Sequence, residues 1–434
     1  MKRSTHVLVY LVLMLAIATP YRIAAAEEAA PPAGFTNYTV VAGDNLSKIA
    51  DKTGTSLEKL KEVNPALKTD VLRVGQVLLA PGFAASTTTT TTTAYARPAG
   101  LPAGSISVNG AGATFPAPIY AAWTYAYLTV DPVAAINYQP NGSGAGKKAI
   151  IDRTVDFGGS DSLLKSSEYE KGGDLQMFPM VAGAVVPVFN LTDEKGKVIS
   201  NLVLNRQTLA DIFLGKISQW NDKALVALNP KVTLPNKPIT TAHRSDGSGT
   251  TEIFTLALSS FSDEWKKKVG GAATVQWPNG LGGPGNAGVA AAVKNTPSSI
   301  GYVELSYALE NKIPFALMVN KAGVTVKASA KSLQSAMSDF SGKFDKNLTV
   351  TLVDAPGRIS WPIAGYTYAI VHTKTMTDCN KAATMLGYFK WALTSKEAGA
   401  MASNLGYAVL PGEVRSQTLA KLAEVTCNGL RVMP

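Results

Sequence analysis

Short apolar runs alternate with turns rich in glycine and hydroxyl residues through most of the chain beyond residue 105. Each run has the β-prone composition of a strand, and in three of four places a helical stretch follows the turn. We expect those helices at 118–128, near 147–153 and up to Leu258. This succession of strand, turn and helix predicts an α/β domain. The four turns lie at 110–115, 142–146, 160–161 and 244–251.

Residues 37–81 have a more compact pattern, which predicts a strand, two helices and a second strand. After the first β-prone run, Asp44 can cap a helix that begins near Asn45. A second helix with one apolar face ends before Asn64, and an apolar strand returns over 71–79. We therefore expect a separate small βααβ domain.

The amino-terminal segment has the pattern of a signal peptide, which we assign to residues 1–26. Lys2 and Arg3 precede an apolar run of twelve residues, and three alanines ending at Ala26 fit the small-residue cleavage rule. A short membrane anchor is the alternative, but a span needs about 20 apolar residues. Because no cysteine lies directly after the apolar run, lipid anchoring is not expected. We therefore expect an exported protein, in the periplasm, the cell wall or the extracellular space.

Length and composition limit the organisation of the rest of the chain. The 434 residues, of which 46% are hydrophobic, suffice for two or three domains with packed cores. A run of seven threonines within 82–104 predicts a linker, which leaves 105–434 as the main domain. The formal charge is +10, yet no basic stripe or base-stacking motif favours nucleic acid as a partner.

The cysteine and histidine content excludes several kinds of site. Two cysteines cannot build a four-thiolate zinc site, and three histidines leave little for histidine-based metal chemistry. We therefore expect no metal site. In an oxidising compartment, a disulfide between Cys379 and Cys427 is favoured, with two buried free thiols as the alternative.

The four turns have the chemistry of anion capture. The first amides of a helix lack intrahelical partners, and the helix dipole favours negative charge beside them. Serine and threonine add hydroxyl donors, and Arg244 supplies a positive charge that can bind two oxygens in a fork. The pattern indicates a tetrahedral oxyanion held mainly by neutral donors. Asp246 can pair with Arg244 beside the anion, and the alternative is that the two form a surface ion pair.

Asp161 is unexpected in such a site, because a carboxylate repels an anion. It becomes useful where the ligand carries a proton, since an ionised aspartate only accepts hydrogen bonds. Hydrogen phosphate has a proton near neutral pH and sulfate has none, so Asp161 would reject sulfate. The alternative is that Asp161 caps a helix beginning at Leu163 or Leu164.

A set of short motifs covers the whole small domain: Tyr38-Thr39-Val40, Gly43-Asp44, Leu46, Ile49-Ala50, Leu57, Leu60, Asn64-Pro65 and Val74-Gly75-Gln76. Together they resemble a LysM module, which implies binding of N-acetylglucosamine chains in peptidoglycan or chitin. The implied groove lies between two loops and comprises Gly43, Asp44, Asn45, Leu46, Asn64, Pro65, Ala66 and Leu67. The alternative is that these residues only hold the small fold together.

A second set of motifs runs from about Ile106 to near the carboxyl terminus, at 110–118, 137–139, 155–158, 160–161, 212–217, 220–222, 244–250, 285–289 and 299–304. Together they resemble the phosphate-binding protein family of the bacterial Pst transporter, PstS. The resemblance implies phosphate contacts from Thr114, Phe115 (through its amide), Ser143, Asp161, Arg244, Ser248, Gly249 and Thr250. It also implies a two-lobed periplasmic-binding-protein type II fold with a hinge, in which lobe I spans about 105–185 and 355–434 and lobe II about 186–354.

Phosphate-cradling loops also occur in enzymes, so a phosphate-handling hydrolase is an alternative function. The chain has no Gly-x-x-x-x-Gly-Lys-Ser/Thr loop and no Gly-x-Ser-x-Gly elbow, and the spacing does not support a triad of Ser248, His372 and Asp161. We therefore expect no enzyme activity and no cofactor.

The sequence predicts a monomeric solute-binding protein that captures inorganic phosphate in a cleft between two lobes. An ABC permease and an N-acetylglucosamine-containing glycan are the expected partners. A wall-associated scavenger or sensor without a permease is the alternative.

Overall fold

The computed structural model describes residues 35–41, 44–53, 55–65, 67, 71–81 and 94–433. It divides into two compact units, Met1–Thr91 and Thr92–Pro434, which are described separately. The predicted signal peptide, its cleavage site and the threonine run lie outside the described residues. Within the described ranges, no helix is both long and apolar enough to cross a membrane.

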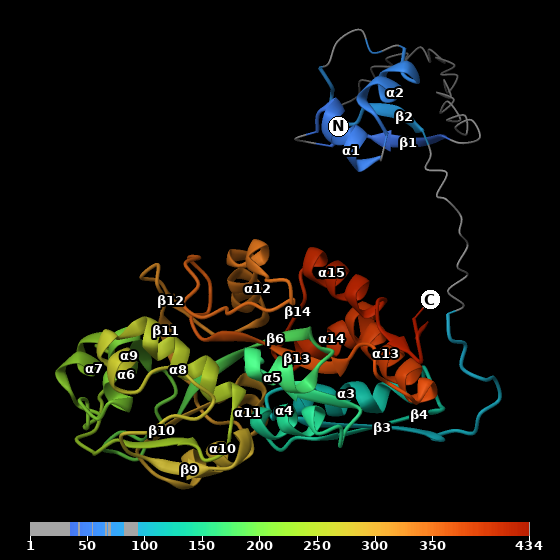
Figure 1. Ribbon diagram of the computed structural model, residues 1–434. Coiled ribbons are helices and arrows are strands. Elements are labelled where there is room, and N and C mark those ends of the chain that lie inside the picture. The colour runs from blue at the N-terminus through green and yellow to red at the C-terminus, as the bar shows by residue number, and fades with distance from the viewer. Residues whose placement is uncertain are drawn as a thin grey trace, which may run out of the picture. The chain divides into compact units, whose positions relative to one another are not determined.

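The described part of the small unit has the order β1 (Phe35–Thr39), α1 (Leu46–Lys52), α2 (Leu57–Glu62) and β2 (Val77–Pro81) (Figure 1). The two strands pair antiparallel, and Leu46, Ile49 and Leu60 are buried in the core that the four elements share. The predicted βααβ order is therefore confirmed.

The cap of α1 differs from the prediction by one residue. The Lys48 amide donates to Asn45 Oδ1 at 2.9 Å, so Asn45 caps the helix. The carboxylate of Asp44 instead accepts bonds from the Tyr38 hydroxyl and the Val41 amide. Asp44 thus holds the end of the first strand to the loop that precedes α1.

The large unit is built on a nine-stranded sheet with the order β4-β3-β5-β13-β6-β10-β8-β9, beside which β14 pairs with β6. The strands are β3 (Ile106–Gly112), β4 (Ala134–Gln139), β5 (Phe157–Ser160), β6 (Leu175–Asn190), β8 (Thr240–Arg244), β9 (Leu281–Gly283), β10 (Ser299–Glu304), β13 (Ala364–His372) and β14 (Ala408–Val409). Two smaller ladders comprise β7 (Val203–Asn205), β11 (Leu317–Val319) and β12 (Thr325–Val326), and β15 (Thr426–Cys427) with β16 (Leu430–Arg431).

Helices gather around both halves of the large sheet (Figure 1). Around the β3–β5 half lie α3 (Ala117–Tyr127), α4 (Ser143–Ile151), α5 (Ser166–Gly172), α13 (Cys379–Thr394), α14 (Lys396–Asn404) and α15 (Gly412–Leu422). Around the β8–β10 half lie α6 (Arg206–Phe213), α7 (Lys223–Leu228), α8 (Gly249–Phe261), α9 (Asp263–Lys268), α10 (Gly285–Asn295) and α11 (Leu305–Glu310). α12 (Ala330–Asp339) contacts β6 and β14. The arrangement confirms the predicted α/β class.

The long strand β6 joins the two halves. Its residues up to Ala184 pair with β13, and from Val185 onward they pair with β10. A second crossing runs beside it, because the Trp361 indole donates to the Val185 carbonyl at 3.0 Å and the Val185 amide donates to the Ile363 carbonyl at 2.9 Å. The two halves are thus connected by adjacent extended segments.

Two features tie the ends of the large unit to its body. Cys379 and Cys427 form a disulfide, which confirms the expected pairing. The second part of the predicted linker also packs here, since Arg97 makes a two-bond ion pair with Asp131 at 2.6 and 2.8 Å. The described part of the predicted linker, residues 94–104, therefore belongs to the large unit.

Candidate functional site

The predicted turns lie at the carboxyl ends of strands in both halves of the large sheet. Three of them belong to the neighbouring strands β3, β4 and β5, and the fourth follows β8 in the other half. The turn at 142–146 is the first part of α4, which begins at Ser143, earlier than the predicted start near Lys147. Gly142 precedes this helix with a φ of 103°, and a Cβ there would lie 2.4 Å from Asp246 Oδ2. Glycine is therefore required for both the conformation and the close approach.

Three predicted residues from separate turns meet at the Ser143 hydroxyl. Its oxygen accepts from the Asp161 amide at 3.2 Å and from the Gly249 amide at 3.0 Å. A Cβ at Gly249 would lie 2.5 Å from the Asp161 Cβ, so the two turns touch. Asp161 follows β5 and Gly249 begins α8, so this contact joins the two halves of the unit.

The remaining predicted neutral residues are also buried around this contact: Thr114, Phe115, Ser248 and Thr250. Ser248 Oγ accepts from the Thr251 amide at 3.1 Å and so caps α8. The Phe115 carbonyl accepts from the Tyr407 hydroxyl at 2.7 Å. The structure thus brings all eight predicted contacts to one region.

Arg244 is the cationic residue of the site and ends β8. Its guanidinium is almost fully buried and donates through Nε and Nη2 to the two carboxylate oxygens of Asp246, at 2.8 and 2.5 Å. Burial alone would raise the pKa of Asp246, but the hydrogen bonds and charge of Arg244 lower it. A guanidinium has five N–H donors, so Arg244 keeps donors for a further acceptor. The Arg244 side chain is buried and that of Asp246 is 26% exposed, so the pair is not the surface ion pair of the alternative.

Asp161 has the properties of a ligand acceptor. α5 begins only at Ser166, so the alternative that Asp161 caps a helix at Leu163 or Leu164 is wrong. Its Oδ1 atom is buried and has no hydrogen-bond partner among the described residues. Burial raises the pKa of Asp161 to about 7, although the nearby Thr367 hydroxyl and the charge of Arg244 oppose the shift. The carboxyl group is thus poised to exchange or share a proton near neutral pH.

The sequence did not identify the layer of polar residues behind the site. Asn286, Glu304, Tyr307 and Tyr407 are buried there, and the Tyr307 hydroxyl donates to the Thr114 carbonyl at 2.6 Å. The motifs at 285–289 and 299–304 contain two of these residues, but the sequence marks them only as parts of the family resemblance. No local pattern marks the two tyrosines, because they reach the site from distant parts of the chain.

Glu304 carries a testable consequence for stability. Its Oε1 has no partner among the described residues, and burial raises its pKa from 4.5 to about 8. Between these pH values the unfolded chain binds fewer protons, so this group lowers the stability of the folded protein as pH rises. Glu304→Gln should therefore stabilise the protein by roughly 3 kcal/mol at pH 8 and have little effect at pH 5. Urea unfolding at both pH values measures this, and a gain that is equal at both would contradict it.

The structure gives some predicted glycan-binding residues of the small unit a structural role. Asn64 Nδ2 donates to the carbonyls of Leu60 and Leu79, and its Oδ1 accepts from the Leu79 amide, so it joins α2 to β2. Leu46 is buried in the core, and Leu67 packs against it. Pro65 lies in the turn that follows α2, whereas Gly43 and Ala66 lie outside the described residues.

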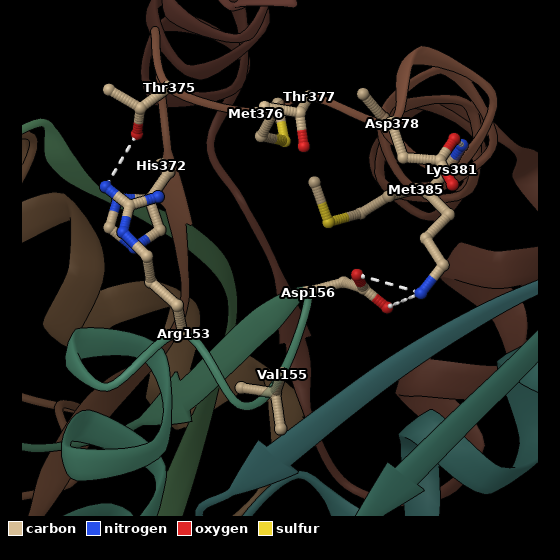
Figure 2. Close-up of a pocket in the computed structure, with 11 residues that line it drawn as sticks. Arg153, Val155, Asp156, His372, Thr375, Met376, Thr377, Asp378, Lys381 and Met385 are labelled. Atoms are coloured by element: carbon tan, nitrogen blue, oxygen red, sulfur yellow. Dashed lines mark hydrogen bonds and ion pairs between the residues drawn. The ribbon is translucent and has the colours of Figure 1, made fainter.

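A separate cavity of about 330 Å³ lies near α13 and contains none of the predicted site residues (Figure 2). Lys381 pairs with Asp156 across it at 3.2 Å, and Arg153 donates to Thr375 at 2.8 Å. His372 beside it contacts Asp174 at 2.6 Å and the Ile150 carbonyl at 3.0 Å. Both ring nitrogens are therefore occupied away from Ser248, so the rejected triad is not assembled. Among the described residues, no cluster of His, Cys, Asp and Glu could hold a metal ion.

Family models match both units of the chain. Residues 84–397 match the PBP superfamily domain, and residues 38–81 match the LysM domain.

Individual proteins are similar over most of the chain. It is 44% identical over 316 residues to the phosphate-binding protein PstS of Xylella fastidiosa (strain 9a5c), covering 72% of this chain and 84% of that protein. To the protein of the same name from Haemophilus influenzae it is 43% identical over 311 residues, covering 71% and 90%. The crystal structure of a DING protein has a TM-score of 0.60 at 22% identity and covers 74% of this chain and 98% of that one, which supports the fold.

Proposed function

Because the chain belongs to the PstS family of phosphate-binding proteins, we propose that its large unit captures hydrogen phosphate between the two halves of the sheet. The observation that carries this proposal is the contact of Ser143, Asp161 and Gly249, which come from both halves of the sheet. Beside it, the buried Oδ1 atom of Asp161 has no hydrogen-bond partner among the described residues. Arg244, buried hydroxyl groups and helix-start amides would hold the charge. Asp161 would accept a hydrogen bond from the protonated oxygen of the ligand.

Calorimetric titration of the chain without residues 1–26 tests this function, after bound phosphate has been removed by unfolding and refolding. At pH 8 we expect one phosphate per chain, weaker binding of arsenate and no heat with sulfate. A folded protein that gives no heat with phosphate would overturn the proposal.

The proposed delivery of the captured phosphate rests on the family resemblance. We propose that the protein is a monomer that delivers phosphate to an ABC permease, because the similarity covers most of the length of the relatives. A wall-associated scavenger or sensor is the second candidate, favoured by the LysM match at 38–81. We propose no hydrolytic step, since Ser248 caps α8 and His372 is bonded elsewhere.

We further propose that the small unit tethers the exported protein to a glycan that contains N-acetylglucosamine. The chain should sediment with insoluble peptidoglycan or chitin, and a variant without residues 35–81 should stay in the supernatant. Phosphate titration of the same variant serves as a control and should be unchanged. Equal sedimentation of both proteins would exclude the small unit as the tether.

A further inference from the structure

Asn286 links two hydroxyl groups of the proposed phosphate site. It is fully buried near the start of α10, and its Nδ2 donates to Thr114 Oγ1 at 2.9 Å and to Thr250 Oγ1 at 3.1 Å. Thr114 follows β3, and Thr250 lies in the first turn of α8. One amide group therefore reaches hydroxyls from both halves of the sheet.

The orientation of this amide is fixed by its other end. Asn286 Oδ1 accepts from the Glu304 backbone amide at 3.1 Å. A backbone N–H can only donate, so the atom facing it must be the oxygen, and the NH₂ group must face the threonines.

The hydroxyl hydrogens are restricted as a result. The Asn286 backbone amide also donates to Thr114 Oγ1, at 3.2 Å, so both lone pairs of that oxygen are occupied. Thr250 Oγ1 has one lone pair occupied by Asn286. In the described part of the chain, neither hydroxyl donates to a protein acceptor in return. Each hydrogen is therefore left for an acceptor in the site.

We propose that Asn286 is a positioning residue that fixes the hydroxyls of Thr114 and Thr250 as donors to the bound anion. This inference rests on the proposed function and extends it, because it assigns two recognition contacts to one residue that does not touch the ligand. Fixed donors face the unprotonated oxygens of hydrogen phosphate, while Asp161 faces the protonated one. The ligand proton is thereby directed to a single position.

A double-mutant cycle with phosphate titration tests this role. Asn286→Ala should weaken phosphate binding by about 10-fold in the wild-type background, because two oriented hydrogen bonds are weakened. In a Thr114→Val, Thr250→Val background the same substitution should change affinity less than about twofold. In a Ser143→Ala background it should again cost about 10-fold, because the Ser143 hydroxyl is not bonded to Asn286. Equal losses in all three backgrounds would indicate a general structural role and overturn the proposal.

Two further variants keep the result interpretable. Asn286→Asp preserves volume but presents only acceptors, so it should turn both hydroxyls away from the anion and cost at least about 100-fold. Asn229→Ala removes another buried asparagine, one that bonds Val203 and Leu225 away from the site, and should leave phosphate affinity unchanged. Wild-type affinity in a folded Asn286→Asp variant would also overturn the inference. A wild-type protein without phosphate binding would refute the proposed function itself, whereas binding with no coupling would refute only the role of Asn286.

Discussion

Replacement of Arg244 by alanine is expected to weaken phosphate binding by about 10³-fold, or about 4 kcal/mol. The side chain is almost fully buried, so its charge acts on the ligand with little screening by water. The substitution also leaves Asp246 without its ion-pair partner, and the freed carboxylate would repel an anion beside it. Titration calorimetry with phosphate measures the loss.

Two other variants separate charge from hydrogen-bond geometry in this result. Arg244→Lys keeps the charge but not the planar fork, so it should lose less affinity than alanine while remaining weaker than the wild type. Arg206→Ala breaks another ion pair of the large unit, with Asp354, and should leave phosphate affinity unchanged. If Arg244→Ala bound phosphate like the wild type, Arg244 would have no place in the site.

Features of the site encoded in short stretches of sequence could be predicted. The strand, the turn and the hydroxyl residues around 244–251 are adjacent in sequence, and β8 and α8 follow that order in the structure. The role proposed for Asp161 also rests on its residue type, since an acidic group among turns suited to anions calls for a protonated ligand. The α/β class likewise followed from the alternation of local elements.

The start of α4 could not be predicted from local propensity. The sequence predicts a turn over 142–146, because glycine is a poor helix former. In the structure the helix lies directly on the sheet, and a Cβ at Gly146 would be 2.5 Å from the Gly112 Cα. Close packing between helix and strand therefore overrides propensity here.

The buried polar residues behind the site could not be predicted from the sequence for a different reason. Asn286 lies 172 positions from Thr114, and Tyr407 lies 292 positions from Phe115. Contacts of this kind depend on how the two halves come together, and periodicity carries no information about them. In the small unit, Asn64 bonds across 15 positions to Leu79 in β2, so the sequence alone leaves both a structural and a glycan-binding role open for it.

Substitution of Asp161 by asparagine is expected to reduce the discrimination between phosphate and sulfate by about 10³-fold. An ionised aspartate can only accept, so it favours the oxygen of phosphate that carries a proton. Asparagine can turn either its carbonyl toward that proton or its NH₂ toward an unprotonated sulfate oxygen. We therefore expect a modest loss of phosphate affinity and a large gain of sulfate affinity. Competitive titration with the two anions measures the ratio, and Asp131→Asn, which alters an ion pair elsewhere, is the matched control.

The pH dependence of sulfate binding tests the same role of Asp161. It does not depend on how large the change in phosphate-to-sulfate selectivity is. Burial raises the pKa of Asp161 to about 7, so a growing share of the carboxyl groups carries a proton as pH falls from 8 to 6. A protonated carboxyl can donate to sulfate, which itself stays ionised over this range. Wild-type affinity for sulfate should therefore rise as pH falls, whereas that of Asp161→Asn should stay constant, since the amide does not titrate. A rise of equal size in both proteins would assign the titration to another group, and unchanged selectivity in Asp161→Asn would remove Asp161 from ligand recognition.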